Sequence, residues 1–382
     1  MIIQTDRQLA DFCAELRNET AIFVDTEFVG EGRYYPEVGA IQVASPTQAA
    51  LIDPLAITNL VPLGEILAHP GIVKVFHAAT QDLAIFYRLF ARPTAPLFDT
   101  QIAAALLGYD EQISFANLVE RVTGVHLAKS HSFTDWLRRP LSAGQIEYAL
   151  DDVRYLAKVY DHLVAELQTQ GRLEWAREEY SPLENEARFQ PSEPRELYLK
   201  LRGVERIHGP ALVALRELIA WREETARALN IPSGKIARDE VMMELARHPR
   251  LNVKELREVR GLQPQQVDRF GREMIEIARQ DATVPCPRIP RPPSLPPVLE
   301  PTVDFLILCL RSLAGEMALS PGLLATRSDL AALIQSGERA EVPLMRGWRR
   351  QAVGNALLAT LQGKATARVI PGSRQVHLEW HN

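Results

Sequence analysis

Two carboxylates stand two residues apart in the segment FVDTEF, residues 23–28. The apolar run Ala21–Val24 predicts a short buried strand, and side chains two residues apart on a strand point to the same face. Asp25 and Glu27 would therefore project together from the end of this strand. Two adjacent anions repel each other unless a cation lies between them, and their oxygens suit a hard divalent ion. Two unrelated acids in a solvated loop are the alternative.

A third acid, Asp82, follows the next strand. The β-branched run Ile72–Phe76 predicts that strand, and a helix is expected from Thr80 to Phe90. Asp82 would lie in the first turn of this helix, where a carboxylate commonly stabilises the helix dipole without any catalytic role. Metal binding is the second interpretation, and it requires Asp82 to meet the first two acids in the fold.

Tyr148 and Asp152 are four residues apart in the segment YALDDV. A helix is expected from Ser142 to about Leu167, and residues four apart share one face of a helix. The pair could form an ordinary surface hydrogen bond, or it could bring a hydroxyl and a carboxylate to a catalytic site. Asp151 is only three residues from Tyr148 and could compete for the same role.

Further strand and helix signals alternate through the first half of the chain. The additional segments are strands at Gly39–Ala44, Ala49–Asp53 and Phe98–Thr100 and helices at Ile57–Ala68 and Gln101–Leu107. Asp99 is expected to cap the last of these helices rather than to bind a metal. This succession of strands and helices predicts an α/β domain with a mixed sheet and helices packed on it.

In order along the chain, the runs IFVDTEF, HAATQDL and YALDDV resemble the tyrosine-bearing branch of the DEDD superfamily of 3′–5′ exonucleases. Other motifs are similar to those of the ribonuclease D family, namely Tyr35-Pro36, Ile41-Gln42, Phe98-Asp99-Thr100-Gln101, Lys129, Asp135-Trp136 and Arg139-Pro140-Leu141. The resemblance covers about residues 1–170. It implies an RNase H-like α/β exonuclease domain.

The resemblance also implies a metal centre and its chemistry. Four carboxylates would hold two divalent cations, Mg²⁺ or Mn²⁺: Asp25, Glu27, Asp82 and Asp152. Such a pair of ions can activate a water for attack on phosphorus and stabilise the leaving 3′ oxygen. Tyr148 would take the role of the family's tyrosine. Because a tyrosine hydroxyl titrates at about 10 in water, Tyr148 is expected to orient the attacking water rather than to act as its general base.

Five residues are candidates for holding the substrate: Phe28, His77, Gln81, Lys129 and Arg139. Phe28 could stack on the terminal base or simply fill the core. His77 could contact the terminal sugar or phosphate, although a lone histidine at a strand end is more often structural. Gln81 is assigned to the terminal ribose from the resemblance alone. Lys129 and Arg139 could meet phosphates or belong to the ordinary surface.

The second half of the chain is mainly helical and is interrupted by Pro-rich segments. Residues 210–280 resemble an HRDC domain, a small helical module that often binds nucleic acid. The expected domains are an exonuclease domain at residues 1–180, an HRDC domain at 205–283, a stiff, extended Pro-rich linker at 284–301 and a second, diverged HRDC-like domain with a C-terminal hairpin at 302–382. The helical domains could hold RNA, or they could be packing modules only.

Composition and the N-terminal sequence indicate where the protein is located. The 382 residues carry a net charge of −5, with the acidic excess in the first half of the chain and a mildly basic second half. The three cysteines form no C-x-x-C pair, and no apolar run approaches the roughly 18 residues of a membrane span. The N-terminus has no secretory pattern. We therefore expect a cytoplasmic monomer that is not bound to a membrane.

These observations favour a metal-dependent 3′–5′ exoribonuclease. Its substrate would be RNA with a free 3′ end, and it would trim tRNA precursors and other small structured RNAs with release of nucleoside 5′-monophosphates. A DNA exonuclease of the same superfamily is the first alternative, because no residue that would sense a 2′-hydroxyl can be identified. A catalytically inactive nucleic-acid-binding scaffold is the second alternative, and the presence of all five motif residues argues against it.

Overall fold

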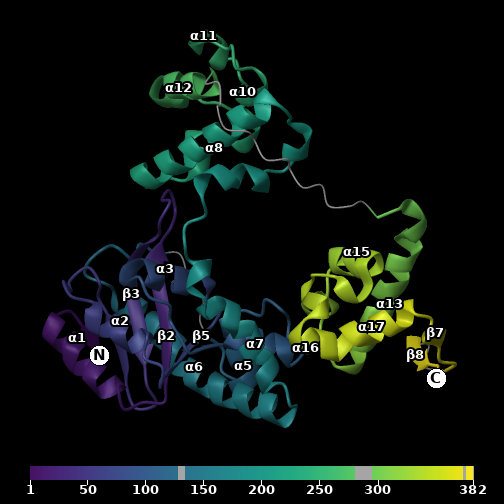
Figure 1. The fold of residues 1–382 in the computed structure, drawn as a ribbon. Helices are drawn as coiled ribbons and strands as arrows, with labels where there is room; N and C mark the ends of the chain where they lie inside the picture. Colours follow the sequence, from purple (N-terminus) through teal and green to yellow (C-terminus); the bar gives the residue numbers. More distant parts are fainter. Residues whose placement is uncertain (128–133, 280–294, 373–375, 382) are drawn as a thin grey trace. The chain divides into compact units, whose positions relative to one another are not determined.

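The structure is a computed structural model that describes residues 1–127, 134–279, 295–372 and 376–381 (Figure 1). The chain forms two compact units. One contains residues 1–27, 38–189 and 294–382, and the other contains residues 28–37 and 190–293. Among the described helices, none combines the length and the apolar character that crossing a membrane requires.

The first unit is built around a six-stranded sheet with the strand order β1-β4-β3-β2-β5-β6. Its strands are β1 (Ile2–Ile3), β2 (Ala21–Val29), β3 (Glu37–Ala44), β4 (Ala49–Ile52), β5 (Val73–Phe76) and β6 (Leu97–Asp99). β1 lies parallel to β4, β3 lies antiparallel to β4, and β5 lies parallel to both β2 and β6. The mixed sheet predicted from the sequence is therefore confirmed.

Helices of residues 1–127 and 134–189 accompany the sheet (Figure 1). They are α1 (Asp6–Leu16), α2 (Val61–Leu67), α3 (Thr80–Phe90), α4 (Thr100–Leu106), α5 (Phe115–Thr123), α6 (Ala143–Thr169) and α7 (Leu173–Glu184). α3 lies where the sequence predicts it. α6 begins after Ser142, which forms a capping box with Gln145 and so fixes the first turn of the helix. α2 starts later than predicted, at Val61.

α6 covers one face of the sheet, and α3 begins on the other. Phe23 of β2 packs edge-on against Tyr160 of α6, with ring centroids 6.0 Å apart. Thr26, three residues further along β2, contacts the first turn of α3. Because successive strand residues alternate between faces, these two contacts lie on opposite sides of the sheet. The end of β2 is thus flanked by both helices.

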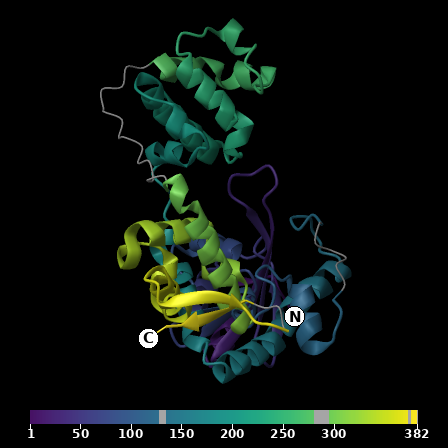
Figure 2. The ribbon, with the colours of Figure 1, turned by 90° about the vertical axis from the view of Figure 1, so that its right-hand side faces the viewer.

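The C-terminal helical region, residues 295–381, belongs to the first unit. Its elements are α13 (Glu300–Glu316), α14 (Pro321–Leu324), α15 (Arg327–Ser336), α16 (Gly347–Arg349), α17 (Asn355–Leu361), β7 (Ala365–Val369) and β8 (Val376–Trp380). β7 and β8 form the predicted antiparallel hairpin, drawn in yellow in Figure 2. The predicted extended linker is wrong at its C-terminal end, because a 3₁₀ turn at Pro297–Leu299 leads directly into α13. Residues 284–294 of that linker lie outside the described ranges.

Trp348 anchors the C-terminal helical region on α7. Its buried ring stacks on Trp175, with centroids 4.6 Å apart and an interplanar angle of 16°. Its indole N–H donates to Glu179 at 2.7 Å, and the Arg349 guanidinium donates to the same carboxylate at 3.0 Å. The Gly-Trp-Arg segment is therefore attached to α7 by an aromatic stack and by two side-chain donors that share the Glu179 carboxylate.

The second unit is a helical domain, as the sequence predicts. Its helices are α8 (Pro210–Leu229), α9 (Ser233–Ile236), α10 (Asp239–Arg247), α11 (Val253–Leu256) and α12 (Pro264–Arg279). Leu218 of α8, Met242 of α10 and Met274 of α12 are fully buried in one core. The hydroxyl of Tyr34, in the 28–37 segment of this unit, donates to Glu223 of α8.

Candidate metal centre and active site

Three carboxylates from distant parts of the chain meet at the end of β2. Asp25 and Glu27 come from this strand, and Asp152 comes from α6. Each offers an oxygen atom that lies within 4.8 Å of the oxygens offered by the other two. α6 presents Asp152 at this position because a stripe of its neighbours is buried in the core: Ala149, Leu150, Val153 and Leu156.

Asp82 joins these carboxylates through β2. It lies in the first turn of α3 and is only 7% exposed. The Thr26 hydroxyl donates a hydrogen bond to its carboxylate. Since Thr26 stands between Asp25 and Glu27, this bond holds Asp82 beside the strand that carries the other acids. The four acids singled out in the sequence therefore gather around the end of one strand, and we call them the carboxylate cluster.

Burial and the charges of neighbouring acids raise the pKa of every carboxyl group in the cluster. Burial, followed by the charge of Asp152, raises the pKa of Asp25 to about 8. Burial, followed by the charges of the other three acids, raises the pKa of Glu27 to about 9. The pKa of Asp82 rises to about 8 through burial and the charge of Asp25. The pKa of Asp152 rises to about 7 through burial and the charge of Asp151. A site that disfavours its own negative charge fits divalent cations, which would neutralise it.

Tyr148 lies one helical turn before Asp152 on α6 and is partly buried. The centroid of its ring is 6.3 Å from that of Trp136, which is 2% exposed. The Gln145 side-chain amide donates to the hydroxyl of Thr134 at 3.1 Å and so ties the segment that carries Trp136 to α6. A buried indole therefore supports the tyrosine ring on the helix that also carries Asp152.

Arg139 has a structural role in the fold, whereas the sequence left it between a phosphate contact and the ordinary surface. Its Nε and Nη2 donate to the two carboxylate oxygens of Asp53 at 2.9 and 2.6 Å, and Asp53 is 3% exposed. Nη2 also donates to the Gly39 carbonyl at 2.6 Å. Nη1 donates to the carbonyls of Trp136 and Arg138 at 2.8 and 3.1 Å. All the guanidinium N–H groups are thus engaged in holding the Trp136 segment on the sheet.

His77 uses both ring nitrogens inside the protein. Nε2 pairs with the Ile113 carbonyl at 3.0 Å, and Nδ1 pairs with the Thr100 hydroxyl at 2.9 Å. Burial lowers the pKa of His77. The predicted contact with the terminal sugar or phosphate would require one of these bonds to break, and the arrangement favours the structural role.

The remaining substrate candidates have different surroundings. Gln81 is exposed in the first turn of α3, directly before Asp82. Phe28 follows Glu27 on β2 and is partly buried. Lys129 lies outside the described residues. Contacts of these three side chains with RNA stay predictions.

Asp99 has a larger role than capping a helix. As predicted, it caps α4, and its carboxylate accepts from the backbone N–H of Gln101 at 2.8 Å. It also accepts from the backbone N–H groups of Ala78 and Ala79 at 3.1 and 2.8 Å. These two residues form the turn between β5 and α3, where Ala78 adopts a left-handed conformation with φ 58°. Asp99 therefore anchors the start of α3 and, through it, Asp82.

The class of protein follows from this fold and from comparison with known families. A 3′–5′ exonuclease family matches residues 1–168, the part of the chain that contains the sheet and the carboxylate cluster. An HRDC domain family matches residues 211–278, which span α8 to α12. The chain therefore combines a 3′–5′ exonuclease domain with an HRDC domain.

Relatives that match over nearly the whole chain identify the family. Ribonuclease D of Gluconacetobacter diazotrophicus is 36% identical over 372 residues, which cover 95% of this chain and 93% of the relative. Ribonuclease D of Pseudomonas paraeruginosa is 37% identical over 368 residues, which cover 94% and 97%. Escherichia coli RNase D, an exoribonuclease involved in structured RNA processing, has a crystal structure that matches with a TM-score of 0.85 and 32% identity over 95% of this chain and 98% of that chain.

The chain belongs to the ribonuclease D family, and it is a metal-dependent 3′–5′ exoribonuclease. The family resemblance read from the motifs is confirmed. The two alternatives, a DNA exonuclease and an inactive scaffold, are not favoured, because the relatives that span the whole chain are ribonucleases.

Proposed function

We propose that this exoribonuclease trims the 3′ ends of tRNA precursors and other small structured RNAs and releases nucleoside 5′-monophosphates. The observation that carries the proposal is the meeting of Asp25, Glu27 and Asp152, whose oxygens lie within 4.8 Å of one another. Partly buried acids at this separation are unfavourable unless cations neutralise them. We also propose that the enzyme works as a monomer in the cytoplasm.

The proposed metal ligands are the four members of the carboxylate cluster, which would hold two ions of Mg²⁺ or Mn²⁺. Their all-oxygen donor set suits both ions. When bound, such ions supply positive charge for the phosphate and lower the pKa of a coordinated water. The protein's own contribution is to fix the carboxylates. Thr26 holds Asp82 by a hydrogen bond, and Asp99 holds the start of the helix that carries it.

Tyr148 is proposed to orient the attacking water through its hydroxyl group. The support for this role is its place on α6, one turn before Asp152 and against the buried ring of Trp136. Phe28 and Gln81 are proposed to contact the terminal base and the terminal ribose. Their support is position alone, since one follows Glu27 and the other precedes Asp82.

The C-terminal helical region is proposed to be a diverged copy of the HRDC domain. The support is local conformation. The four-residue helix α9 follows the long helix α8, and the four-residue helix α14 follows the long helix α13. Both short helices end at an extended alanine, Ala237 with φ −164° and ψ 149° and Ala325 with φ −160° and ψ 152°. The residue before each alanine, Ile236 or Leu324, is buried in its own domain.

One experiment tests the main proposal. A tRNA carrying a 3′ extension is incubated with the full chain in EDTA, in Mg²⁺ and in Mn²⁺, and the released nucleotides are identified by mass spectrometry. We expect stepwise shortening from the 3′ end, only with metal, and nucleoside 5′-monophosphates as products. Internal cleavage, 3′-monophosphate products or undiminished activity in EDTA would overturn the proposal. A DNA strand of matched sequence distinguishes RNA preference from general exonuclease activity.

A further inference from the structure

Gly39 lies inside strand β3, which neighbours the strand that carries Asp25 and Glu27. A glycine within a strand weakens it, because it has no side chain to pack and loses more conformational freedom on folding than any other residue. The backbone does not require glycine here, since Gly39 is not among the described glycines with positive φ. A strand glycine of this kind often marks a place where another backbone approaches closely. At Gly39, that neighbour is Trp136.

The main chain of Trp136 occupies the space that a side chain at position 39 would take. A β-carbon added to Gly39 would meet the carbonyl oxygen of Trp136 and would stand 2.7 Å from its Cβ and 2.8 Å from its carbonyl carbon. These atoms cannot swing aside as the end of a flexible side chain can. Any larger residue must therefore displace the Trp136 segment (residues 134–140) on the sheet.

Arg139 pins the Trp136 segment to the strand on which it lies. Its guanidinium donates to the Gly39 carbonyl at 2.6 Å and to the Trp136 carbonyl at 2.8 Å. The same group forms an ion pair with the carboxylate of Asp53, which directly follows β4. The segment therefore cannot leave β3 without loss of these bonds. The missing side chain at position 39 and the arginine bridge together set the height of the Trp136 ring above the sheet.

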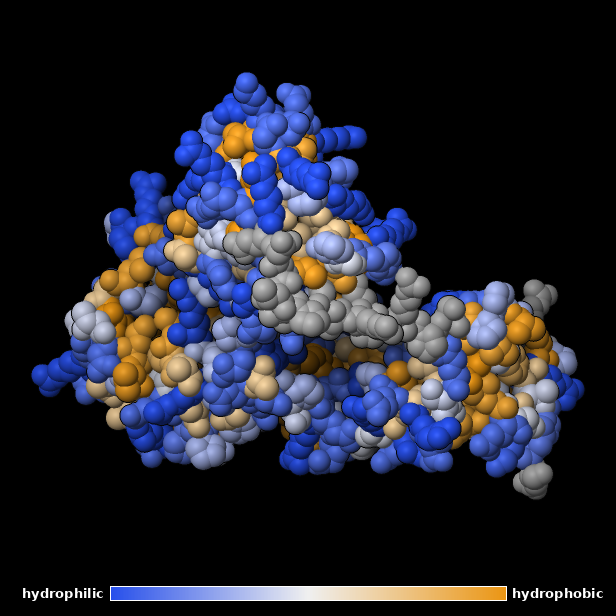
Figure 3. Space-filling model, turned by 45° about the horizontal axis from the view of Figure 1, so that its top comes forward, coloured by the Kyte–Doolittle hydropathy of each residue, from blue (hydrophilic) through white to orange (hydrophobic). Residues whose placement is uncertain are grey.

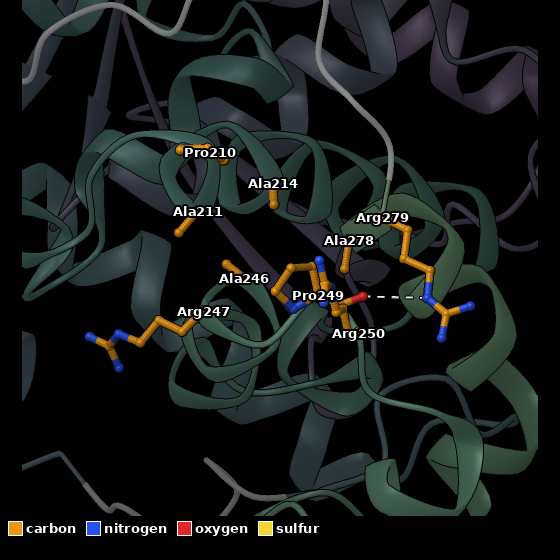
Figure 4. Close-up of a pocket in the computed structure, with 9 residues that line it drawn as sticks. All are labelled: Pro210, Ala211, Ala214, Ala246, Arg247, Pro249, Arg250, Ala278 and Arg279. Atoms are coloured by element: carbon orange, nitrogen blue, oxygen red, sulfur yellow. Dashed lines mark hydrogen bonds between the residues drawn. The ribbon is translucent and has the colours of Figure 1, made fainter.

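Small residues elsewhere in the protein leave space open instead. In the HRDC domain, alanines of α8, α10 and α12 line a cleft of about 500 Å³, and Figure 4 shows Ala214, Ala246 and Ala278 around it. Arginines also line this cleft, and the visible face of the domain in Figure 3 is mainly hydrophilic. The space over Gly39 is filled by contrast, because the residue that lies there, Trp136, is only 2% exposed. The indole therefore has little room to shift.

The Trp136 ring in turn supports Tyr148 on α6. The two ring centroids are 6.3 Å apart, and the ring planes are inclined by 36°. The Gln145 side chain donates to the Thr134 hydroxyl at 3.1 Å, which fastens the Trp136 segment to α6 as well. Because the segment is held on both β3 and α6, a displacement of Trp136 at Gly39 changes the support of the Tyr148 ring.

We propose that Gly39 is a positioning residue for the catalytic step: by letting Trp136 lie directly on β3, it sets the position of the Tyr148 hydroxyl relative to Asp152. This inference rests on the proposed function, in which that hydroxyl orients the attacking water. A misplacement of about 1 Å at a group that aligns reactants can cost about a hundredfold in rate. Gly39 offers no side chain to RNA or to a metal ion, so its effect belongs in kcat and not in RNA affinity.

The test uses the full chain and two variants that each add one methyl group. Gly39→Ala crowds Trp136. Gly64→Ala is the matched control, because its new β-carbon would stand 2.7 Å from Phe90, at the opposite end of α3 from Asp82. Trimming of a 3′-extended tRNA in Mg²⁺ gives kcat and KM, and fluorescence anisotropy in EDTA gives RNA affinity. We expect Gly39→Ala to lower kcat at least about fivefold, with KM and RNA affinity within about twofold, and the control to keep kcat within about twofold.

A double variant shows whether the effect passes through the tyrosine. Adding Gly39→Ala to Tyr148→Phe should lower kcat by less than about twofold further, because the hydroxyl that Gly39 positions is already absent. A glycine that only stabilises the fold would lower kcat by the same factor in both backgrounds. Such additivity would overturn the proposal, as would an unchanged kcat in Gly39→Ala or an equal loss in Gly64→Ala.

Circular dichroism and the melting temperature verify the folding of each variant. If Gly39→Ala is unfolded, Trp136→Phe replaces it, since this change shortens the ring beside Tyr148 and leaves Gly39 uncrowded, and the same kcat loss and non-additivity are expected. A wild-type chain that trims no RNA in Mg²⁺ would sink the proposed function, and a normal kcat in Tyr148→Phe would remove the tyrosine's role together with this inference. Trimming that is slowed by Tyr148→Phe but not by Gly39→Ala would sink this inference alone.

Discussion

The hydroxyl of Thr26 donates a hydrogen bond to the carboxylate of Asp82, and both residues are buried. This bond joins β2 to the first turn of α3. The two neighbours of Thr26 on the strand are Asp25 and Glu27, so a single tripeptide contributes two members of the carboxylate cluster and the support for a third. The middle residue of the motif therefore has a positioning role of its own.

Replacing Thr26 by Val removes the donor and retains the shape of the side chain. We expect the affinity for Mn²⁺ to fall about fivefold, because a net hydrogen bond contributes about 1 kcal/mol. Isothermal titration calorimetry with Mn²⁺ measures this change. Thr26→Ser keeps the hydroxyl and should bind within twofold of wild type. If the Val variant binds Mn²⁺ normally, or the Ser variant is equally weak, the hydrogen bond does not position Asp82.

Neutralising a member of the carboxylate cluster should slow catalysis without destabilising the fold. Asp25→Asn and Asp152→Asn should each lower the trimming rate by at least about a hundredfold, since each removes a charged oxygen from the proposed metal site. In EDTA, both variants should melt at or above the temperature of the wild type, because one repulsive charge is gone. Asp161→Asn is the matched control, since Asp161 is an exposed acid on the same helix as Asp152. Wild-type trimming by either cluster variant would exclude that residue as a ligand.

The melting temperature of the metal-free protein should decrease as the pH rises. The pKa values of Asp25, Glu27, Asp82 and Asp152 in the folded protein are about 8, 9, 8 and 7. The same groups titrate at about 4 in an unfolded chain. Between this pH and the pKa values of the folded protein, the folded state therefore holds more protons than the unfolded state. Stability therefore rises as the pH falls through this window and is lost as the pH rises.

In EDTA, we expect a higher melting temperature at pH 6 than at pH 8.5. Asp25→Asn should show a smaller difference in melting temperature between these two pH values. Comparing the variant with the wild type removes the contribution of other titrating groups. Saturating Mg²⁺ should reduce or reverse the dependence, because metal binds the deprotonated carboxylates. A metal-free wild type that melts higher at pH 8.5, with the same slope in Asp25→Asn, would contradict the raised pKa values.

Local patterns in the sequence were sufficient to predict those parts of the site that lie on a single strand or a single helix. Strand alternation places Asp25 and Glu27 on one face, and helical spacing places Tyr148 one turn from Asp152. α1 also has an apolar stripe that can be read from the sequence, with Leu9, Phe12, Cys13 and Leu16 buried, although the sequence prediction includes no helix there. The core helices and strands of an α/β fold can thus be predicted from the periodicity of apolar residues.

Contacts between segments far apart in the sequence could not be predicted from such local patterns. Arg139 and Asp53 are separated by 86 positions, and nothing in either local pattern pairs them. Asp99 could be recognised as a helix cap, but its bonds to the turn before α3 depend on how β5 and β6 lie side by side. The stack of Trp348 on Trp175 depends likewise on tertiary packing. Residue type therefore left Arg139 between a phosphate contact and the ordinary surface, whereas the fold uses it as a bridge between the Trp136 segment and Asp53.

Removing the hydroxyl of Tyr148 should slow catalysis without weakening RNA binding. In Tyr148→Phe the ring still packs against Trp136, so the loss is confined to the group proposed to orient the water. We expect kcat to fall at least about tenfold with KM unchanged within twofold. Tyr155→Phe, on the same helix, is the control and should retain wild-type kinetics. A large rise in the dissociation constant for RNA in EDTA would instead make Tyr148 a binding residue.

The bridge between Arg139 and Asp53 can be tested against the phosphate contact expected from the sequence. Arg139→Gln leaves the Asp53 carboxylate buried without its charged partner, so we expect the free energy of unfolding to fall by about 3–5 kcal/mol. Arg138→Gln is the adjacent control, since Arg138 is exposed, and it should be neutral within about 0.5 kcal/mol. Adding Asp53→Asn to Arg139→Gln should cost less than the sum of the single changes, because the two side chains form one interaction. A phosphate-binding arginine would behave in the opposite way, raising KM for RNA while leaving urea denaturation unchanged.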